Sequence, residues 1–198
     1  MVQEPDDSLD PRIRRTRQLL QQALEKLLET NEFDKISVHD IAGAATVNRA
    51  TFYAHYPDKF ALLECLVGSR FHELLAQRGV QFDNCSSALK AIVLAVCDYL
   101  THAQGPDSQR RLEPHMESAI IAVVRRMLLE GLTRHPSENA AIAPEIIAST
   151  ASWAIYGAAK EWVQTPDRGP SEEIANTVTL LVSPILHQAQ GQPAHSMA

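Results

Sequence analysis

Cysteine is scarce in this sequence. The chain has 198 residues and only 3 cysteines, Cys65, Cys85 and Cys97. An odd, widely spaced set without a CxxC pair favours neither a disulfide framework nor a zinc site of that type. His102 and His115 stand on either side of a break near Cys97, but they form no i, i+4 pair. We therefore expect free thiols, no metal and no cofactor.

Several other features are missing. No run of 18 apolar residues is present, so a membrane span is not expected. The start, MVQEPDDSLDP, lacks the basic residues and apolar stretch of a secretory signal, and a cytoplasmic location is the default expectation. There is no Gly-rich phosphate loop, nucleophile elbow, HExxH motif or catalytic carboxylate pair. These absences argue against an enzyme.

Strand-like alternation and internal repeats are also absent, whereas apolar residues recur at helical spacing. Hydrophobic residues make up 45% of the chain, enough to bury a core. We predict an all-α protein of about nine helices. The expected order is a disordered tail (1–11), a small three-helix domain (12–57), a larger helical domain (58–190) and a second disordered tail (191–198).

Clear signals mark the starts and ends of the short helices. Ser37 is predicted to be an N-cap, with Asp40 three residues later as in a capping box. Asn48 is predicted to cap the next helix, and Pro57 to end it, because the residue before a proline avoids the helical conformation. Asp58 is predicted to cap a long helix to about residue 78. The outer helices are expected at about 11–30, 114–134, 145–163 and 171–189, with a further apolar stripe over 89–100.

Charge is distributed unevenly. The net charge is −6, which by itself argues against binding to nucleic acid. However, Arg12, Arg14, Arg15 and Arg17 place four cations within six residues. Phosphate contacts are local, so a small DNA-binding segment can sit on an acidic protein. An ordinary solvated helix start would explain the arginines equally well.

The stretch 37–59 has the layout of a helix-turn-helix. Two helices of seven or eight residues are joined by residues 46–48, and the first turn of the second helix contains no acid. In this motif the second helix enters the major groove with its N-terminal residues on base edges. Arg49 can pair with guanine, and the methyl groups of Ala50 and Thr51 can contact thymine. The sequence therefore predicts a recognition helix that begins at Asn48.

The segment SVHDIAGAATVNRATFYAHYPDKFALLECL resembles the DNA-binding domain of the TetR family of bacterial regulators, most specifically in its aromatic-x-His-aromatic-Pro-x-Lys pattern. Two positions depart from the family, which usually has glycine where Glu32 and Thr46 stand. We expect Asn31 to adopt the left-handed conformation in place of the first glycine, and Thr46 to have either a negative φ or a strained backbone. The resemblance implies DNA contacts from Thr16, Arg17, Ser37, Asn48, Arg49, Ala50, Thr51, Tyr53, His55 and Lys59.

The resemblance implies that residues 12–57 form a helix-turn-helix DNA-binding domain and that residues 58–190 form a helical ligand-binding and dimerisation domain. It implies a homodimer that binds double-stranded DNA at a palindromic operator and is released by a small-molecule effector through a population shift. A helical ligand-binding dimer that does not bind an operator, and a transcriptional activator, remain alternatives. Expected dimer contacts are Ile147, Ala151, Ile155, Trp162, Ile174, Val178, Leu181, Val182 and Ile185. Expected pocket residues, which could equally belong to an ordinary core, are Cys65, Phe71, Cys97, Leu100, His115, Met116, Ile120, Trp153 and Tyr156.

Overall fold

The computed structural model describes residues 10–78, 85–102, 114–134 and 142–187. Within these ranges the chain forms eight α-helices, one short 3-10 helix and no strand, so the all-α prediction is confirmed with one helix fewer than the nine expected. None of the described helices is long and apolar enough to cross a membrane. The elements are α1 (Pro11–Leu28), η2 (Phe33–Lys35), α2 (Val38–Ala44), α3 (Arg49–His55), α4 (Lys59–Gln77), α5 (Cys85–His102), α6 (Pro114–Arg134), α7 (Pro144–Gln164) and α8 (Ser171–His187).

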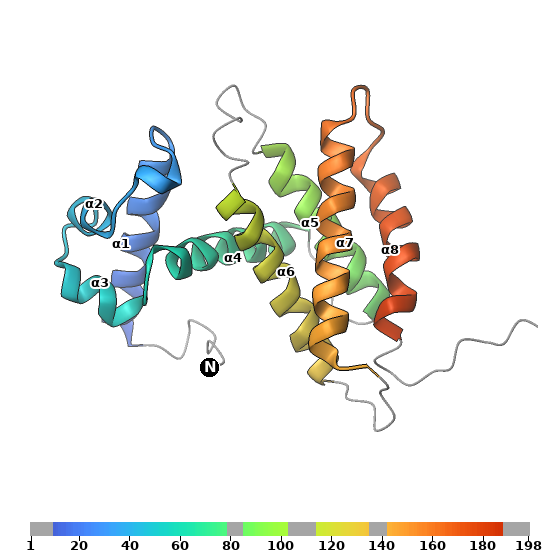
Figure 1. The fold of residues 1–198 in the computed structure, drawn as a ribbon, viewed down its shortest axis with the longest axis horizontal. Helices are drawn as coiled ribbons and strands as arrows, with labels where there is room; N and C mark the ends of the chain where they lie inside the picture. The colour runs from blue at the N-terminus through green and yellow to red at the C-terminus, as the bar shows by residue number, and fades with distance from the viewer. Residues whose placement is uncertain (1–9, 79–84, 103–113, 135–141, 188–198) are drawn as a thin grey trace, which may run out of the picture.

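The first three helices form a small head at one end of the molecule (Figure 1). Leu20 and Leu24 of α1 are fully buried, and they belong to the same core as Ile41 of α2 and Phe52 of α3. Burial of one side chain of this size contributes about 1.5–3 kcal/mol. These apolar contacts hold α2 and α3 against α1, because helices of only 7 residues are not stable on their own in water.

Helix α4 joins the head to the rest of the chain (Figure 1). Tyr56 has an extended backbone before Pro57, which ends α3, and Asp58 caps α4 by accepting a hydrogen bond from the amide of Ala61 at 2.8 Å. Both ends agree with the sequence prediction. Helix α4 packs on α1 at one end and on α5 and α6 further along. It is therefore the covalent and mechanical connection between the head and the body.

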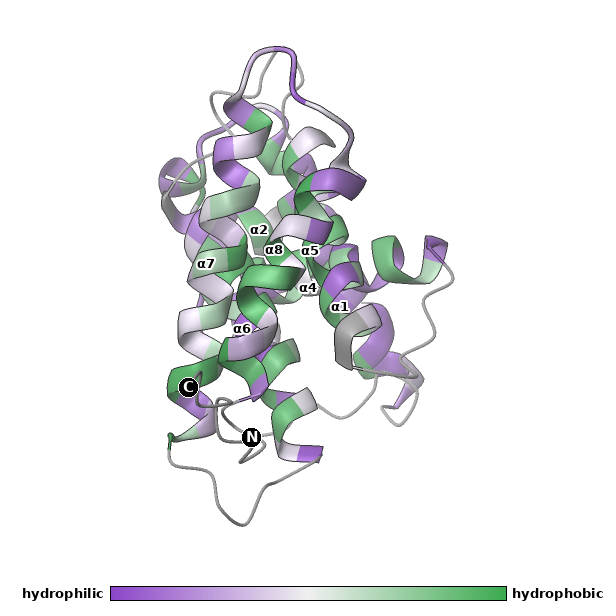
Figure 2. Cartoon of the chain, turned by 90° about the vertical axis from the view of Figure 1, so that its right-hand side faces the viewer, coloured by the Kyte–Doolittle hydropathy of each residue, from purple (hydrophilic) through white to green (hydrophobic). Residues whose placement is uncertain are grey.

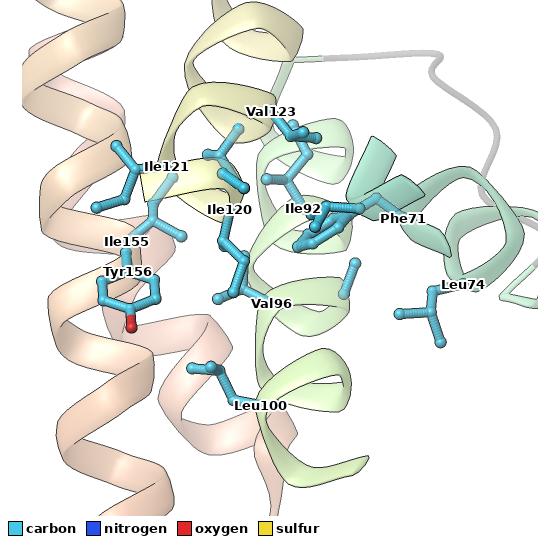
Figure 3. Packing of buried hydrophobic residues seen from close by; sticks show 14 of the residues in the cluster. Phe71, Leu74, Ile92, Val96, Leu100, Ile120, Ile121, Val123, Ile155 and Tyr156 are labelled. Carbon is cyan, nitrogen blue, oxygen red and sulfur yellow. The ribbon is translucent and has the colours of Figure 1, made fainter. Parts of the chain in front are cut away.

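The body consists of α5 to α8, packed against the second half of α4. Its core lies between helices that are distant in sequence, and Figure 3 shows Ile120 of α6 beside Val96 of α5, with Phe71 of α4 and Ile155 of α7 on either side. The stripe expected over 89–100 is buried as predicted. The body is thus a helical bundle on which α4 carries the head.

Two details differ from the sequence prediction. Helix α1 begins at Pro11, capped by Asp10, so the first tail cannot extend to residue 11; residues 1–9 and the second tail lie outside the described residues. Helix α1 ends at Leu28. The backbone amide and the side-chain amide of Asn31 both donate hydrogen bonds to the carbonyl of Leu27, at 3.0 Å each. Asn31 does not have a positive φ, so the predicted left-handed conformation there is wrong.

Candidate nucleic-acid interface

A reciprocal capping box fixes the start of α2. The amide of Asp40 donates to Ser37 Oγ at 3.2 Å, and a carboxylate oxygen of Asp40 accepts from the Ser37 amide at 2.9 Å and from its hydroxyl. These hydrogen bonds, which favour the charged carboxylate, hold the pKa of Asp40 below its usual value. The capping box predicted from sequence is confirmed. The Ser37 hydroxyl, however, is already used within the box.

The turn between α2 and α3 is a Schellman motif. The amide of Val47 donates to the carbonyl of Ala42 at 2.9 Å, and the amide of Thr46 donates to that of Gly43 at 3.1 Å. This motif requires a left-handed residue after the helix, usually glycine, and here Thr46 occupies it with φ of 57°. A positive φ in a β-branched residue is strained. Of the two outcomes expected for Thr46, the structure therefore shows the strained backbone.

Helix α3 presents its first turn to solvent. Asn48 caps it by accepting from the Thr51 amide at 2.7 Å and from the Thr51 hydroxyl at 3.0 Å. Phe52 is fully buried in the head and fixes the rotation of the helix, which leaves Arg49 and Ala50 exposed. Tyr53 remains 55% exposed, with its ring edge-to-face against Phe52.

The first turn of α3 contains no acidic residue. Asn48 accepts from the Thr51 amide, but no acidic side chain within this turn neutralises the positive end of the helix dipole. An exposed, acid-free helix N-terminus of this kind suits an anionic partner such as the DNA backbone.

Helix α1 places a cation at the other end of α3. The guanidinium of Arg17 lies 5.7 Å from the ring centre of Tyr56, and its Nε is buried without a hydrogen-bond partner among the described residues. Partial burial, and to a lesser extent the charge of Arg17, lower the pKa of the nearby His55. The hydroxyl of Thr16 donates to the carbonyl of Arg12 at 2.9 Å. Arg17 and His55 therefore come together, whereas Thr16 is bonded to its own helix.

Lys59 lies in a different environment from the one expected for a phosphate contact. Its ammonium donates to the carbonyls of Phe33 at 2.9 Å, Ile36 at 2.8 Å and Asp34 at 3.3 Å. It also lies 4.6 Å from the centre of the Phe33 ring. An ammonium group has three donors, and all three are used. Lys59 thus fastens the start of α4 to η2, and we omit it from the proposed DNA contacts.

The expected dimer residues divide into two groups. Five of them face into the body and are at most 2% exposed, because α7 and α8 pack on α5 and α6 on that side. For these five the interface prediction is corrected: they are core residues of one chain. Trp162, Ile174 and Ile185 are partly buried, and Leu181 is 67% exposed. The five inward residues are Ile147, Ala151, Ile155, Val178 and Val182.

A different apolar face of α7 and α8 points outward, and we call it the α7–α8 face. On α7 it contains Ile146 and Trp153, which are 60% and 57% exposed, with the exposed Gly157 one turn further on. On α8 it contains Leu180, 76% exposed, and Leu181. Figure 2 views the molecule from the right-hand side of Figure 1, where α8 lies, and shows hydrophobic positions among polar ones on its helices. Sequence periodicity could not identify this face, because α7 is apolar almost all round.

The expected pocket residues also separate. Five of them are buried in the body, and Figure 3 shows Tyr156 and Leu100 among these: Phe71, Cys97, Leu100, Ile120 and Tyr156. Trp153 belongs to the exposed α7–α8 face instead. Cys65 faces the head, where its sulfur accepts from Gln21 at 3.2 Å, and His115 pairs with Asp34 of η2 at 2.8 Å. For Trp153, Cys65 and His115 the pocket prediction is therefore corrected.

No group of three or more His, Cys, Asp or Glu side chains that could hold a metal is found in the described part of the chain. Cys65 and Cys97 are free thiols. Burial, chiefly, raises the pKa of Cys97 to about 12.

Similarity to known proteins is concentrated in the head. The model of the bacterial regulatory proteins of the tetR family matches residues 20–66. The uncharacterized HTH-type regulator YxbF of Bacillus subtilis (strain 168) is 36% identical over 73 residues, which cover 36% of this chain and 19% of YxbF. The HTH-type regulator EthR of Mycolicibacterium smegmatis is 37% identical over 67 residues, or 34% of this chain and 29% of EthR. Each match thus spans less than a third of the relative.

The likeness of the body is structural. A TetR-family regulator from Streptomyces coelicolor A3 superposes with a TM-score of 0.56 over 94% of this chain and 99% of its own, at 15% sequence identity. At that identity the likeness establishes the fold. The head therefore resembles the TetR family in sequence over residues 20–66, and the chain as a whole has the fold of this regulator.

Proposed function

We propose that this protein is a transcriptional regulator that inserts α3 into the major groove of double-stranded DNA. The observation that carries the proposal is the exposed, acid-free first turn of α3, held in place by the buried Phe52. A helix-turn-helix presents the N-terminal residues of its second helix to base edges in this way. The match of residues 20–66 to the family model supports the same function.

The geometry divides the proposed contacts. Arg49 and Ala50 are exposed at the start of α3 and would contact base edges, Arg49 favouring guanine. The Thr51 hydroxyl is bonded to Asn48, so its methyl group is the part left for thymine. Tyr53 and the guanidinium of Arg17 would contact phosphates on either side. The remaining expected residues would support these contacts indirectly, through the helix caps of Ser37 and Asn48 and the packing of Thr16 and His55 within the head.

We propose that two copies pair through the α7–α8 face. A soluble monomer rarely exposes several large apolar side chains together, and a helix-turn-helix protein reads a palindromic operator as a two-fold dimer. The exposed Gly157 has nothing within 4 Å of the position a Cβ would take. A helix from a second copy can therefore approach α7 closely there.

Duplexes selected from a random pool test DNA binding. Affinity for the selected duplex is measured by fluorescence anisotropy at several salt concentrations, and a steep negative salt slope is expected. Arg49→Ala should lower affinity by roughly 5–150-fold, equivalent to about 1–3 kcal/mol, and relax base preference at one position. Arg70→Ala removes the same charge from an exposed site on α4 and should change affinity little. If no duplex is enriched, or if Arg49→Ala behaves like Arg70→Ala, the proposal is wrong.

Sedimentation velocity tests the dimer. The double variant Leu180→Glu/Leu181→Glu places two carboxylates on the α7–α8 face and should shift the protein to monomer. Leu19→Glu makes the same kind of change at a 37% exposed position of α1 and should leave the dimer intact. A wild-type protein that sediments as a monomer at micromolar concentration would contradict the pairing.

Repression and release by an effector are the finer part of the proposal. A ligand that binds better to one arrangement of the body than to another would shift the orientation of the heads, and DNA affinity would change in proportion. Ligands that raise the melting temperature are identified first and then added to the DNA complex. Release of DNA supports an effector-controlled repressor. Ligands that stabilise the protein without changing DNA affinity point to a binding protein, and a reporter induced by the apo-protein points to an activator.

A further inference from the structure

Three consecutive side chains at the start of α6 contact three different parts of the molecule. We call residues 115–117 the α6 joint. His115 reaches the head, where its Nε2 lies 2.8 Å from Oδ1 of Asp34 and its ring centre lies 5.5 Å from that of Phe33. Its ring also lies 5.2 Å from that of Phe60 in the first turn of α4. The Asp34 side chain is 71% exposed, so this polar contact by itself contributes little. The three-ring contact is the more substantial part of this link.

Met116, the next residue, faces α5. The hydroxyl of Tyr99 points to its sulfur at 3.6 Å, and the Tyr99 ring stacks on Phe71 of α4 at 5.3 Å. Through this side chain the α6 joint is anchored to the core of the body. A shift of the joint would therefore disturb packed groups.

Glu117 faces α7. One carboxylate oxygen accepts from Lys160 Nζ at 2.7 Å and from the hydroxyl of Tyr156 at 3.2 Å. The side chains of Glu117 and Lys160 are only 27% and 38% exposed. This partly buried network ties the joint to α7, one of the two helices of the α7–α8 face.

Helix geometry explains how one turn reaches both neighbours. Successive residues are rotated by about 100°, so residues two apart point to nearly opposite sides. His115 and Glu117 accordingly contact the head and α7 from opposite faces of α6. The contacts of His115 with Asp34 and Phe33 therefore attach the head to the body directly, in addition to the connection through α4. They act together with the packing of α1 on α4 and the hydrogen bonds of Lys59 to restrain the head relative to the body.

We propose that the α6 joint is a positioning element that couples the orientation of the head to α7. This inference rests on the proposed function, because head orientation matters only when two heads bind one duplex. A displacement of α7 or of the first turn of α6 is transmitted to η2 through His115. Neither His115 nor Glu117 contacts DNA in this scheme.

Hydrogen exchange measured by mass spectrometry tests the coupling without DNA. His115→Ala should speed amide exchange in residues 33–36 several-fold, whereas His115→Phe keeps an aromatic ring on Phe33 and Phe60 and should preserve most of the protection. Glu117→Gln is the decisive variant, since the Glu117 carboxylate bonds to Lys160 and Tyr156 of α7. It should also speed exchange in residues 33–36. Glu73→Gln breaks an exposed ion pair on α4 and should change nothing there.

The same four variants are compared by fluorescence anisotropy on the selected duplex. His115→Ala and Glu117→Gln should each weaken binding about three- to tenfold, with melting temperatures close to that of the wild type. The coupling is refuted if Glu117→Gln changes the amide exchange rate only in α7. The positioning role is refuted if either variant speeds exchange in residues 33–36 while its DNA affinity stays at the wild-type value. A wild-type protein that binds no duplex contradicts the proposed function alone, because the exchange measurements still decide the coupling.

Discussion

Thr46→Gly is expected to stabilise the protein. Thr46 occupies the left-handed position of the Schellman motif that ends α2, with φ of 57°. Its side chain is exposed, so the substitution removes little packing. The two hydrogen bonds of the motif come from the backbone and remain in the variant. The change therefore isolates the conformational cost at one residue.

The magnitude follows from two opposing terms. A left-handed backbone costs an ordinary L-residue about 1–2 kcal/mol, and glycine avoids this cost. Glycine loses about 0.5–1 kcal/mol more backbone entropy on folding than other residues do. Taken at their midpoints, the two terms leave a net stabilisation of about 0.75 kcal/mol, between limits of about 0 and 1.5 kcal/mol. For a chain of this length the midpoint corresponds to a rise of about 1.5–3 °C in melting temperature.

Calorimetry and urea unfolding at one fixed protein concentration measure the effect, because a dimer's stability depends on concentration. Thr46→Ala is the matched control: it deletes the same polar group but keeps a Cβ, so it should gain clearly less than glycine. DNA affinity should stay within about twofold, since the substitution lies before the N-cap of α3. If Thr46→Gly is less stable than the wild type, or no more stable than Thr46→Ala, strain at this turn is not the cause.

Three further predictions follow from individual side chains. Lys59→Met should lower the free energy of unfolding, measured in urea, by about 1–3 kcal/mol, because three carbonyls lose their hydrogen-bond donor. The control Lys35→Met, at a 71% exposed site, should change it by less than about 0.5 kcal/mol, and equal effects of the two variants would contradict the fastening role of Lys59. The pKa of His55 is lowered in the folded protein, so protonation of His55 favours the unfolded chain. The free energy of unfolding of the wild type, relative to that of His55→Gln, should therefore fall as the pH is lowered from about 7 to 5. A difference between the two proteins that does not change with pH would refute this prediction. Cys97, buried and with its pKa raised to about 12, should resist iodoacetamide at about pH 8 in the native protein and react once the protein is unfolded; rapid native labelling seen by mass spectrometry would count against it.

The head was largely predictable from the sequence because its signals are local. The capping box at Ser37, the cap at Asn48 and the stop before Pro57 each involve residues within four positions of one another. The Schellman turn was the exception. Its sequence lacks glycine, and only the backbone shows that Thr46 takes the left-handed position.

The body was less predictable because inward and outward faces depend on tertiary packing. Ile155 and Trp153 lie two residues apart on an almost wholly apolar helix, yet one is fully buried and the other 57% exposed. Likewise, no sequence pattern relates His115 to Asp34, which are 81 positions apart and meet through folding. The environment of Lys59 depends on tertiary folding in the same way, since its carbonyl partners Phe33 and Ile36 lie 26 and 23 positions away in the sequence.

The exposure of Arg49 and Ala50 has a consequence for how binding preference can change. Phe52 and the caps hold α3 in place, while these two side chains contribute no packing to the head. Substitutions there are expected to alter stability by less than about 0.5 kcal/mol. New operator preferences can therefore arise by single steps at these positions without a loss of folded protein, and a library randomised at residues 49 and 50 should yield mostly folded members.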